Sequence, residues 1–158
     1  MSSDKVKNCP FCSSNVDVAK FDESENFLAI YNIAPILPGH SLVIPKRHVE
    51  SLMDLDDKEL HEMMMFSRET TRLLLEVFKS TGFDWTVQEG EEAGQSVPHL
   101  HMHLIPRKSD DLSQPGDWYP LMKESEIEII DSDARSRLST EEMMTIASKI
   151  REFILQRK

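Results

Sequence analysis

Three histidines alternate with apolar residues in the segment His99-Leu-His-Met-His103. Successive side chains of a β-strand point to opposite faces, so this alternation places His99, His101 and His103 together on one face. Three aligned imidazoles make a poor core, because each ring brings two nitrogens that need partners. Near neutral pH, imidazole can act as a nucleophile, an acid or base, or a metal ligand. The segment therefore predicts a reactive site, with a solvent-exposed histidine stripe as the alternative.

A single metal ion bound by all three histidines is excluded by the length of the strand. Side chains two residues apart lie roughly 7 Å from each other, but those four residues apart lie roughly 13 Å from each other. Zinc–nitrogen bonds of about 2 Å cannot bridge the longer distance. At least one imidazole is therefore available for chemistry.

The loop before these histidines is suited to binding phosphate. Gly94-Gln-Ser-Val97 offers backbone N–H groups, a hydroxyl and an amide without a charge that would need burial, although such a stretch is also typical of an ordinary turn. The formal net charge is -10, which argues against binding of nucleic acid through its backbone. A phosphate site in this chain must then be locally positive, or built from backbone amides and imidazoles.

The elements that must hold these residues follow from the apolar periodicity. Strands are expected over residues 26–32, 41–44, 84–88 and about 97–105, and helices over 56–80 and 139–157. Asp56 with Glu59, and Ser139 with Glu142, have the spacing of a capping box. The β-β-α-β-β-α order predicts an α+β domain with a mainly antiparallel sheet.

Two further features of these helices can be tested against a structure. The first helix is expected to bury an apolar face made of Leu60, Met63, Met64, Leu74, Val77 and Phe78, and to stop at Gly82. The second is expected to bury Met143, Ala147, Ile150 and Ile154.

The whole chain, residues 1–158, is expected to form one domain, with residues 1–20 as an N-terminal arm. Residues 108–138 are acidic and contain Pro115-Gly116 and Pro120, so they predict a long surface loop. No apolar run approaches the length of a membrane span, and the first residues lack the apolar segment of a secretion signal. We therefore expect a cytoplasmic protein without membrane contact, in which Cys9 and Cys12 stay reduced.

A longer block resembles a known family. Residues 88–107, from Gln88-Glu-Gly through the three histidines to Pro-Arg107, are similar to the fragile histidine triad branch of the histidine triad superfamily, as are Asn32 and Pro38-Gly-His-Ser-Leu-Val43. The resemblance implies a HIT-like α+β fold with about five strands, a long helix and a C-terminal helix, in a homodimer. It also implies a hydrolase of dinucleoside polyphosphates, such as diadenosine triphosphate, with AMP and ADP as products.

The resemblance assigns roles to individual residues. His101 would be the nucleophile that forms a covalent AMP-histidine. His103 would hydrogen-bond the phosphate and the leaving oxygen, while His40 and His99 would complete the catalytic group. Asn32 matches a ribose-contacting position. Gln88, Gln95 and Ser96 match phosphate-contacting positions, and Gly94 and Val97 are expected to bind substrate beside them. Magnesium would arrive bound to the polyphosphate. Apart from the resemblance, the positive charges of Arg107 and Lys108 could attract the polyphosphate, and the alternative is that both side chains are simply solvated.

The segment Cys9-Pro-Phe-Cys12 resembles the N-terminus of other members of the superfamily, which bind zinc through two cysteines and two histidines. The implied ligands here are Cys9, Cys12, His48 and His99, a normal set for a closed structural zinc site. A free thiol pair and a redox Cys-x-x-Cys are the alternatives, although a redox motif is expected to open a helix near a βαβ unit.

Three other functions remain open at this point. The same nucleophile could hydrolyse AMP-amides (phosphoramidates). A nucleotide-binding regulatory protein could use slow hydrolysis only to end a signal. A zinc-dependent binding module would have no chemistry at all.

Overall fold

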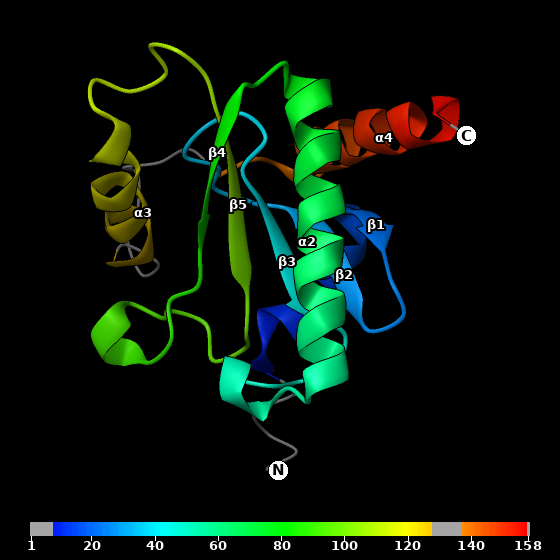
Figure 1. Cartoon of the computed structure of the whole chain (residues 1–158), viewed down its shortest axis with the longest axis vertical. Helices are drawn as coiled ribbons and strands as arrows, with labels where there is room; N and C mark the ends of the chain where they lie inside the picture. Colours follow the sequence, from blue (N-terminus) through cyan, green and yellow to red (C-terminus); the bar gives the residue numbers. More distant parts are fainter. Residues whose placement is uncertain (1–7, 128–136, 158) are drawn as a thin grey trace.

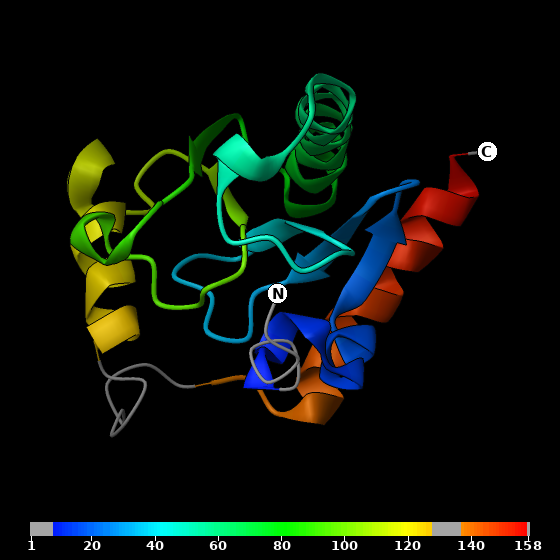
Figure 2. The same cartoon turned by 90° about the horizontal axis from the view of Figure 1, so that it is seen from below.

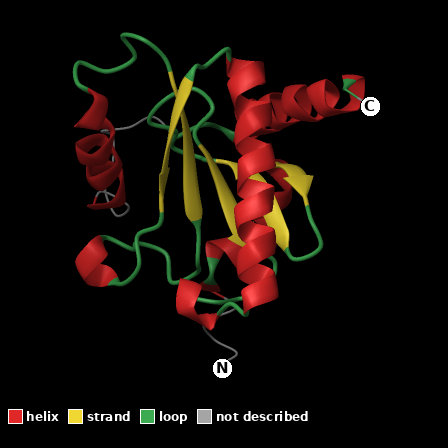
Figure 3. Cartoon of the chain, in the orientation of Figure 1, coloured by secondary structure: helices red, strands yellow, loops and turns green. Residues whose placement is uncertain are grey.

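The sheet of this protein is an open, antiparallel layer of five strands in the order β1-β2-β3-β5-β4 (Figures 1 and 3). The computed structural model describes residues 8–127 and 137–157, with the side chains of 123–127 left out. The strands are β1 (Lys20–Glu23), β2 (Phe27–Tyr31), β3 (Ser41–Pro45), β4 (Gly82–Thr86) and β5 (Met102–Arg107). The expected α+β class is confirmed.

Helix α2 (Asp57–Phe78) runs along the sheet and contacts β2, β4 and β5 (Figure 1). The Asp56 side chain accepts from the backbone N–H of Glu59, and the Glu59 carboxylate accepts from the backbone N–H of Asp56, so the predicted capping box is confirmed. The expected stop at Gly82 is wrong, because Lys79 ends the helix in the left-handed region with φ 52°. Gly82 instead begins β4.

The buried face of α2 differs from the expected one. Met63 and Leu74 are buried and Val77 and Phe78 pack against the core, but Leu60 and Met64 are exposed. Their places in the core are taken by the small polar residues Ser67, Thr70 and Thr71. The Thr71 hydroxyl has partners on both elements, because it donates to the carbonyl of Ser67 on α2 and accepts from the indole of Trp85 on β4. Small hydroxyl side chains thus form part of the buried face of α2.

Helix α4 (Thr140–Gln156) packs along β1 and β2, whereas α2 covers the centre of the sheet (Figure 2). Its capping box, formed by Ser139 and Glu142, is confirmed. The predicted core face is also confirmed, since Met143, Ala147 and Ile150 are buried and Ile154 packs against the core.

A third helix corrects the expectation of a long irregular loop over residues 108–138. Helix α3 (Trp118–Ile127) follows a short turn at Pro115–Asp117. Pro120 lies in the first turn of α3, where an N–H has no partner within the helix, so its missing donor costs the helix nothing. Residues 128–136 of the expected loop lie outside the described residues.

The strands also begin at other residues than expected. Strand β5 starts at Met102 rather than near Val97, so of the three histidines only His103 lies within it. The preceding segment is held by another partner, because the N–H of Leu100 donates to the carbonyl of Val49 at 2.6 Å. Strand β4 covers 82–86 rather than 84–88. Among the described residues, no helix is both long and apolar enough to cross a membrane.

Candidate active site

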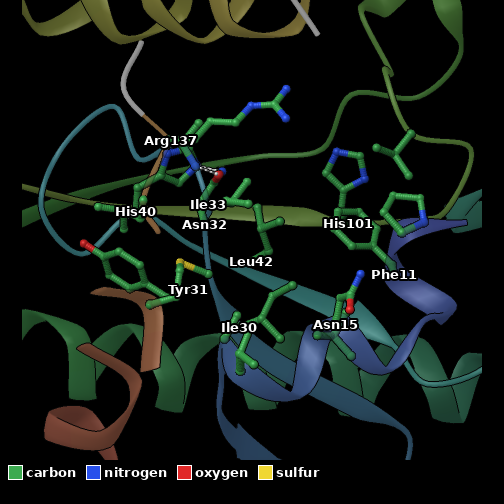
Figure 4. A pocket seen from close by; sticks show the side chains of 18 of the residues that line it. Phe11, Asn15, Ile30, Tyr31, Asn32, Ile33, His40, Leu42, His101 and Arg137 are labelled. Carbon is green, nitrogen blue, oxygen red and sulfur yellow. Dashed lines mark hydrogen bonds between the residues drawn. The ribbon is translucent and has the colours of Figure 1, made fainter. Parts of the chain in front are cut away.

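A cavity of about 600 Å³ lies at the end of the sheet where the N-terminal arm, β2, the segment before β5 and the start of α4 meet (Figure 4). One part of its wall is apolar and includes Val16, Ile30 and Leu42. The other part carries nitrogen and oxygen groups. The polar residues that line it include Asn32, His40, Ser96, His101 and His103. A ligand with an apolar ring at one end and a charged group at the other fits this division.

His101 is held in one tautomer by its own backbone. Its Nδ1 lies 2.7 Å from the carbonyl oxygen of His99. A carbonyl oxygen only accepts hydrogen bonds, so Nδ1 carries the proton and Nε2 keeps its lone pair. Burial lowers the pKa of His101, only partly offset by the bond to His99. The ring is therefore neutral near pH 7 and presents a nucleophilic nitrogen at the cavity.

His40 and His103 form a second pair of rings beside it. The backbone N–H of Ile36 donates to Nδ1 of His40 at 3.3 Å, so the His40 proton resides on Nε2. This Nε2 lies 2.9 Å from Nδ1 of His103 and 3.2 Å from Nδ2 of Asn32, and in this tautomer it donates to His103. In this tautomer the His103 proton lies on Nε2, and the ring centre of His103 lies 5.0 Å from that of His101. The site thus sets the Nε2 lone pair of His101 beside an N–H donor on His103.

The position of His40 depends on the glycine before it. Gly39 has a φ of 93°, and a Cβ added there would lie 2.8 Å from Pro106 and 2.9 Å from Phe78. Only glycine fits this turn, because both the backbone conformation and the space exclude a side chain. The turn delivers His40 to β3 beside His103 on β5.

The loop of residues 90–97 is held in shape by Gln95. Its Nε2 donates to the carbonyl of Glu50 at 2.9 Å, and its Oε1 accepts from the N–H of Gly90 at 2.8 Å. Gly90 and Gly94 both have positive φ, 84° and 91°. Gln95 therefore shapes the loop from behind, while the next residue, Ser96, lines the cavity.

A second cluster lies behind the cavity wall. The four expected ligand atoms, on Cys9, Cys12, His48 and His99, all lie within 4.8 Å of one another. Nδ1 of His99 is 3.4 Å from Cys9 Sγ and 3.5 Å from Cys12 Sγ, and Nδ1 of His48 is 3.3 Å from Cys12 Sγ. Tetrahedral zinc, with bonds of about 2.3 Å to sulfur and about 2.1 Å to nitrogen, separates its ligands by about 3.6 Å. These residues could hold a metal ion.

The surroundings of the cluster also suit a metal. Nε2 of His99 donates to the carbonyl of Pro45 at 3.0 Å, which leaves Nδ1 with its lone pair toward the sulfurs. Burial lowers the pKa of His99 to about 4, so this ligand is neutral. Burial, and then the neighbouring Cys9, raise the pKa of Cys12 to about 11. A cation is therefore needed to stabilise its thiolate.

Phe11 connects the two clusters and was missed by the sequence analysis. Its ring centre lies 5.6 Å from that of His99 and 5.4 Å from that of His101, and it lines the cavity (Figure 4). Its position between the two cysteines was the signal that could have identified it. If Cys9 and Cys12 meet His99, the residue between them must lie close to the histidine segment.

The structure brings most of the expected substrate-binding residues to one place. Asn32, Ser96, Val97 and the expected catalytic residues His40, His101 and His103 all line the cavity. Gln88, Gly94, Gln95 and His99 are not among the lining residues. Gln88 is buried, Gly94 and Gln95 form the loop, and His99 faces the cysteines. Arg107 forms ion pairs with Asp84 and Asp111. It was expected either to attract the polyphosphate or to be solvated, and neither expectation included these ion pairs.

Comparison with known proteins gives a consistent result. The family model described as "HIT domain" matches residues 13–110. A bis(5'-adenosyl)-triphosphatase of Dictyostelium discoideum is 34% identical over 138 residues, which cover 87% of each chain. An asymmetrical bis(5'-nucleosyl)-tetraphosphatase of Schizosaccharomyces pombe is 41% identical over 98 residues, which cover 62% of this chain and only 54% of the relative.

A solved structure supports the same grouping. The diadenosine triphosphate hydrolase of Plasmodium falciparum, solved in complex with cyclomarin A, superposes with a TM-score of 0.71 at 26% identity. The match covers 89% of this chain and 78% of that protein.

Proposed function

The chain belongs to the HIT domain family, and we propose that it is a hydrolase that cleaves dinucleoside polyphosphates to AMP and a second nucleotide. Diadenosine triphosphate is the substrate we infer first, with AMP and ADP as products, because relatives that share much of this sequence carry triphosphatase or tetraphosphatase names. These names support a substrate with a phosphoric anhydride bond next to an adenosine monophosphate unit.

The observation that carries this proposal is the hydrogen bond from His101 Nδ1 to the carbonyl of His99. It leaves the lone pair on Nε2 at the cavity, where it would attack the α-phosphorus of a bound nucleotide. In the first step a P–N bond forms, the bond from phosphorus to the bridging oxygen breaks, and the leaving nucleotide takes the electron pair. The Nε2–H of His103 would donate a hydrogen bond to the leaving oxygen, which departs as an anion. Water then attacks phosphorus, the P–N bond breaks with its electron pair returning to His101 Nε2, and the proton from water passes to the phosphate of the released AMP.

The remaining parts of the nucleotide are assigned by chemistry. The apolar wall of Val16, Ile30 and Leu42 suits the adenine ring, and the amide of Asn32 suits the ribose hydroxyls. Charge on the equatorial phosphate oxygens would be met by Ser96 and the backbone N–H groups of its loop. Magnesium would arrive bound to the polyphosphate, because no carboxylate is found among the described residues that line the cavity.

We propose zinc for the Cys9, Cys12, His48 and His99 cluster. Two thiolates and two imidazoles form a closed tetrahedral set that favours this ion. Its role would be structural, to anchor the N-terminal arm and the ring of His99. Cysteines that stay free of disulfides are typical of intracellular proteins, and we propose the cytoplasm as the location.

We also propose a homodimer. Leu60, Met64 and Met65 are exposed on α2, and Phe83 is exposed on the edge strand β4. Edge strands and apolar helix faces are surfaces that a second copy can cover. Sedimentation of the purified protein would measure the mass directly, and a monomer at micromolar concentration would contradict this part.

The proposed reaction is tested by incubating zinc-replete protein with diadenosine triphosphate and magnesium and separating the products by chromatography. We expect AMP and ADP, and neither from His101→Asn, whose amide cannot act as the nucleophile. Rapid acid quench followed by mass spectrometry should find AMP attached to the wild-type chain. If wild-type protein releases AMP only from an AMP-amide, the dinucleoside assignment is wrong while the nucleophile stands.

A further inference from the structure

The cavity has one charged side chain that neither the sequence analysis nor the proposed reaction uses. Among the described residues that line it, Arg137 is the only lysine, arginine, aspartate or glutamate. The chain as a whole has a formal charge of -10, so the protein surface repels a polyphosphate. A cation at the cavity is therefore the feature most able to offset this repulsion locally.

The arginine at the end of β5, the strand that carries His103, is already paired with carboxylates. Arg107, at the end of β5, donates to Asp84 at 2.6 Å and to both carboxylate oxygens of Asp111 at 2.9 Å. These two carboxylates already offset its charge, and it is not among the residues that line the cavity. The phosphate-binding cation has to be sought elsewhere.

The backbone beside Arg137 is tied to the cavity wall. The N–H of the next residue, Leu138, donates to the carbonyl of Ile33 at 2.9 Å. Ile33 follows Asn32, the residue assigned above to the ribose, and both line the cavity. This hydrogen bond places Arg137 at the cavity although it lies more than one hundred residues away in sequence from Asn32.

The side chain points across the opening. In Figure 4, Arg137 and Asn32 lie on one side of the cavity, and His101 and Phe11 lie on the other. The Arg137 guanidinium extends over Asn32 and Ile33 toward the side of His101. In displacement at phosphorus, the attacking and leaving atoms lie roughly in line on opposite sides. If His101 Nε2 attacks from its side, the leaving group departs toward the side of Arg137.

We propose that Arg137 binds the phosphate groups of the leaving nucleotide, and so selects substrates whose leaving group is a phosphate chain; this inference rests on the proposed function. Guanidinium presents several N–H donors to phosphate oxygens, and charge-assisted bonds of this kind are stronger than neutral ones. As negative charge develops on the leaving oxygen chain, this interaction strengthens. Arg137 makes only non-covalent contacts with the substrate in this proposal.

The test compares two substrates with the same AMP group and different leaving groups. Diadenosine triphosphate releases ADP, whereas AMP p-nitroanilide releases an amine without phosphate. We expect Arg137→Gln to lower the ratio of kcat/KM for diadenosine triphosphate to kcat/KM for AMP p-nitroanilide about tenfold, the low end for hydrogen bonds to charged groups. Arg137→Lys, which keeps the charge, should recover the ratio to within about threefold of wild type.

The matched control is Arg68→Gln on α2, which removes the same charge from an exposed arginine that pairs with Glu69 and does not line the cavity. Its ratio should equal that of wild type. If Arg137→Gln lowers kcat/KM for both substrates equally, or for neither, the proposal is overturned. If Arg68→Gln lowers the ratio as much as Arg137→Gln does, only the overall charge matters, and the proposal is again overturned.

Binding separates failure of this inference from failure of the proposed function. In the His101→Asn background, calorimetry can measure the affinity for diadenosine triphosphate and for AMP with no turnover. Arg137→Gln should weaken the first about tenfold more than the second. This result would support the role of Arg137 even if wild-type protein cleaved no dinucleoside polyphosphate, and equal weakening of both ligands would overturn it.

Discussion

The metal-ligand cluster and the cavity histidines draw on the same short segment, yet they use their ring nitrogens in opposite ways. His99 turns Nδ1 toward two sulfurs and gives Nε2 to the carbonyl of Pro45. His101 gives Nδ1 to a carbonyl and leaves Nε2 for the cavity. Both rings are buried and neutral, so their different roles come from which nitrogen the backbone occupies rather than from charge.

The two regions are linked through the backbone carbonyl of His99 and through the ring of Phe11. The carbonyl of His99 accepts from His101, so the residue that faces the metal cluster also fixes the tautomer of the proposed nucleophile. Phe11 contacts both rings. We therefore expect the metal-ligand cluster to affect mainly the free energy of unfolding, and to affect the rate of hydrolysis only indirectly, through these contacts.

The largest effect is expected from His101→Asn, which removes the nucleophile but leaves the metal cluster whole. Hydrolysis of diadenosine triphosphate should fall on the order of 10⁴-fold or more, as for other essential nucleophiles. Bound zinc, measured by mass spectrometry of the metal, should stay at the wild-type amount. Loss of the metal together with activity would show that the two regions are not separable.

Cys12→Ser should instead remove the metal and leave the proposed nucleophile in place. Without one thiolate the cluster loses its metal, and the free energy of unfolding should fall by about 3 kcal/mol at a zinc concentration a few hundred times the Kd. For a chain of this length, that change lowers the Tm by roughly 6–12 °C in calorimetry. Ser14→Ala, next to the cluster but exposed, serves as the control. An unchanged Tm after zinc chelation of the wild type would refute the structural role.

Phe11→Ala tests the link between the regions. We expect kcat to fall about tenfold, because the ring that packs on His101 is removed, while zinc content is kept; Phe11→Leu should retain most of the rate. Residues that act through one network are not additive. Zinc chelation should thus reduce kcat less in Phe11→Ala than in wild type. Independent, additive losses would mean that Phe11 does not transmit the effect of the metal.

The smallest effect is expected from Gln95→Ala, which cuts the connection of the loop to the segment that carries His48. The variant loses two hydrogen bonds with net contributions of about 1 kcal/mol each. KM should rise a few-fold with kcat within about twofold, and the Gly90 amide should exchange its hydrogen faster. A loss in kcat instead of KM would place Gln95 in the chemical step.

Much of this architecture was predictable because its signals are local. The capping boxes at Asp56 and Ser139 depend on residues three positions apart, and the helices begin where they indicate. The two cysteines, with His48 and His99, were grouped by resemblance, and their ligand atoms do meet. Spacing and residue type carry such information without knowledge of distant contacts.

The errors arose where tertiary contacts decide. Strand β1 is four residues long, has an irregular register and buries only Phe21, so its pairing with β2 and α4, rather than its own pattern, makes it a strand. Helix α3 contains a proline that is harmless only because it falls in the first turn. Arg137 reaches the cavity through a backbone bond to Ile33, which no local pattern encodes.

The cavity wall combines Phe11 and Asn15 from the N-terminal arm with Thr140 and Met143 from α4. A chain leaves the ribosome N-terminus first, so all five strands can pair before α4 has been made. Synthesis of the 17 residues of α4 takes roughly one to three seconds. During that time β1 has no helix over it and the cavity lacks one side. A ligand in the cavity therefore has its full set of contacts only after α4 docks.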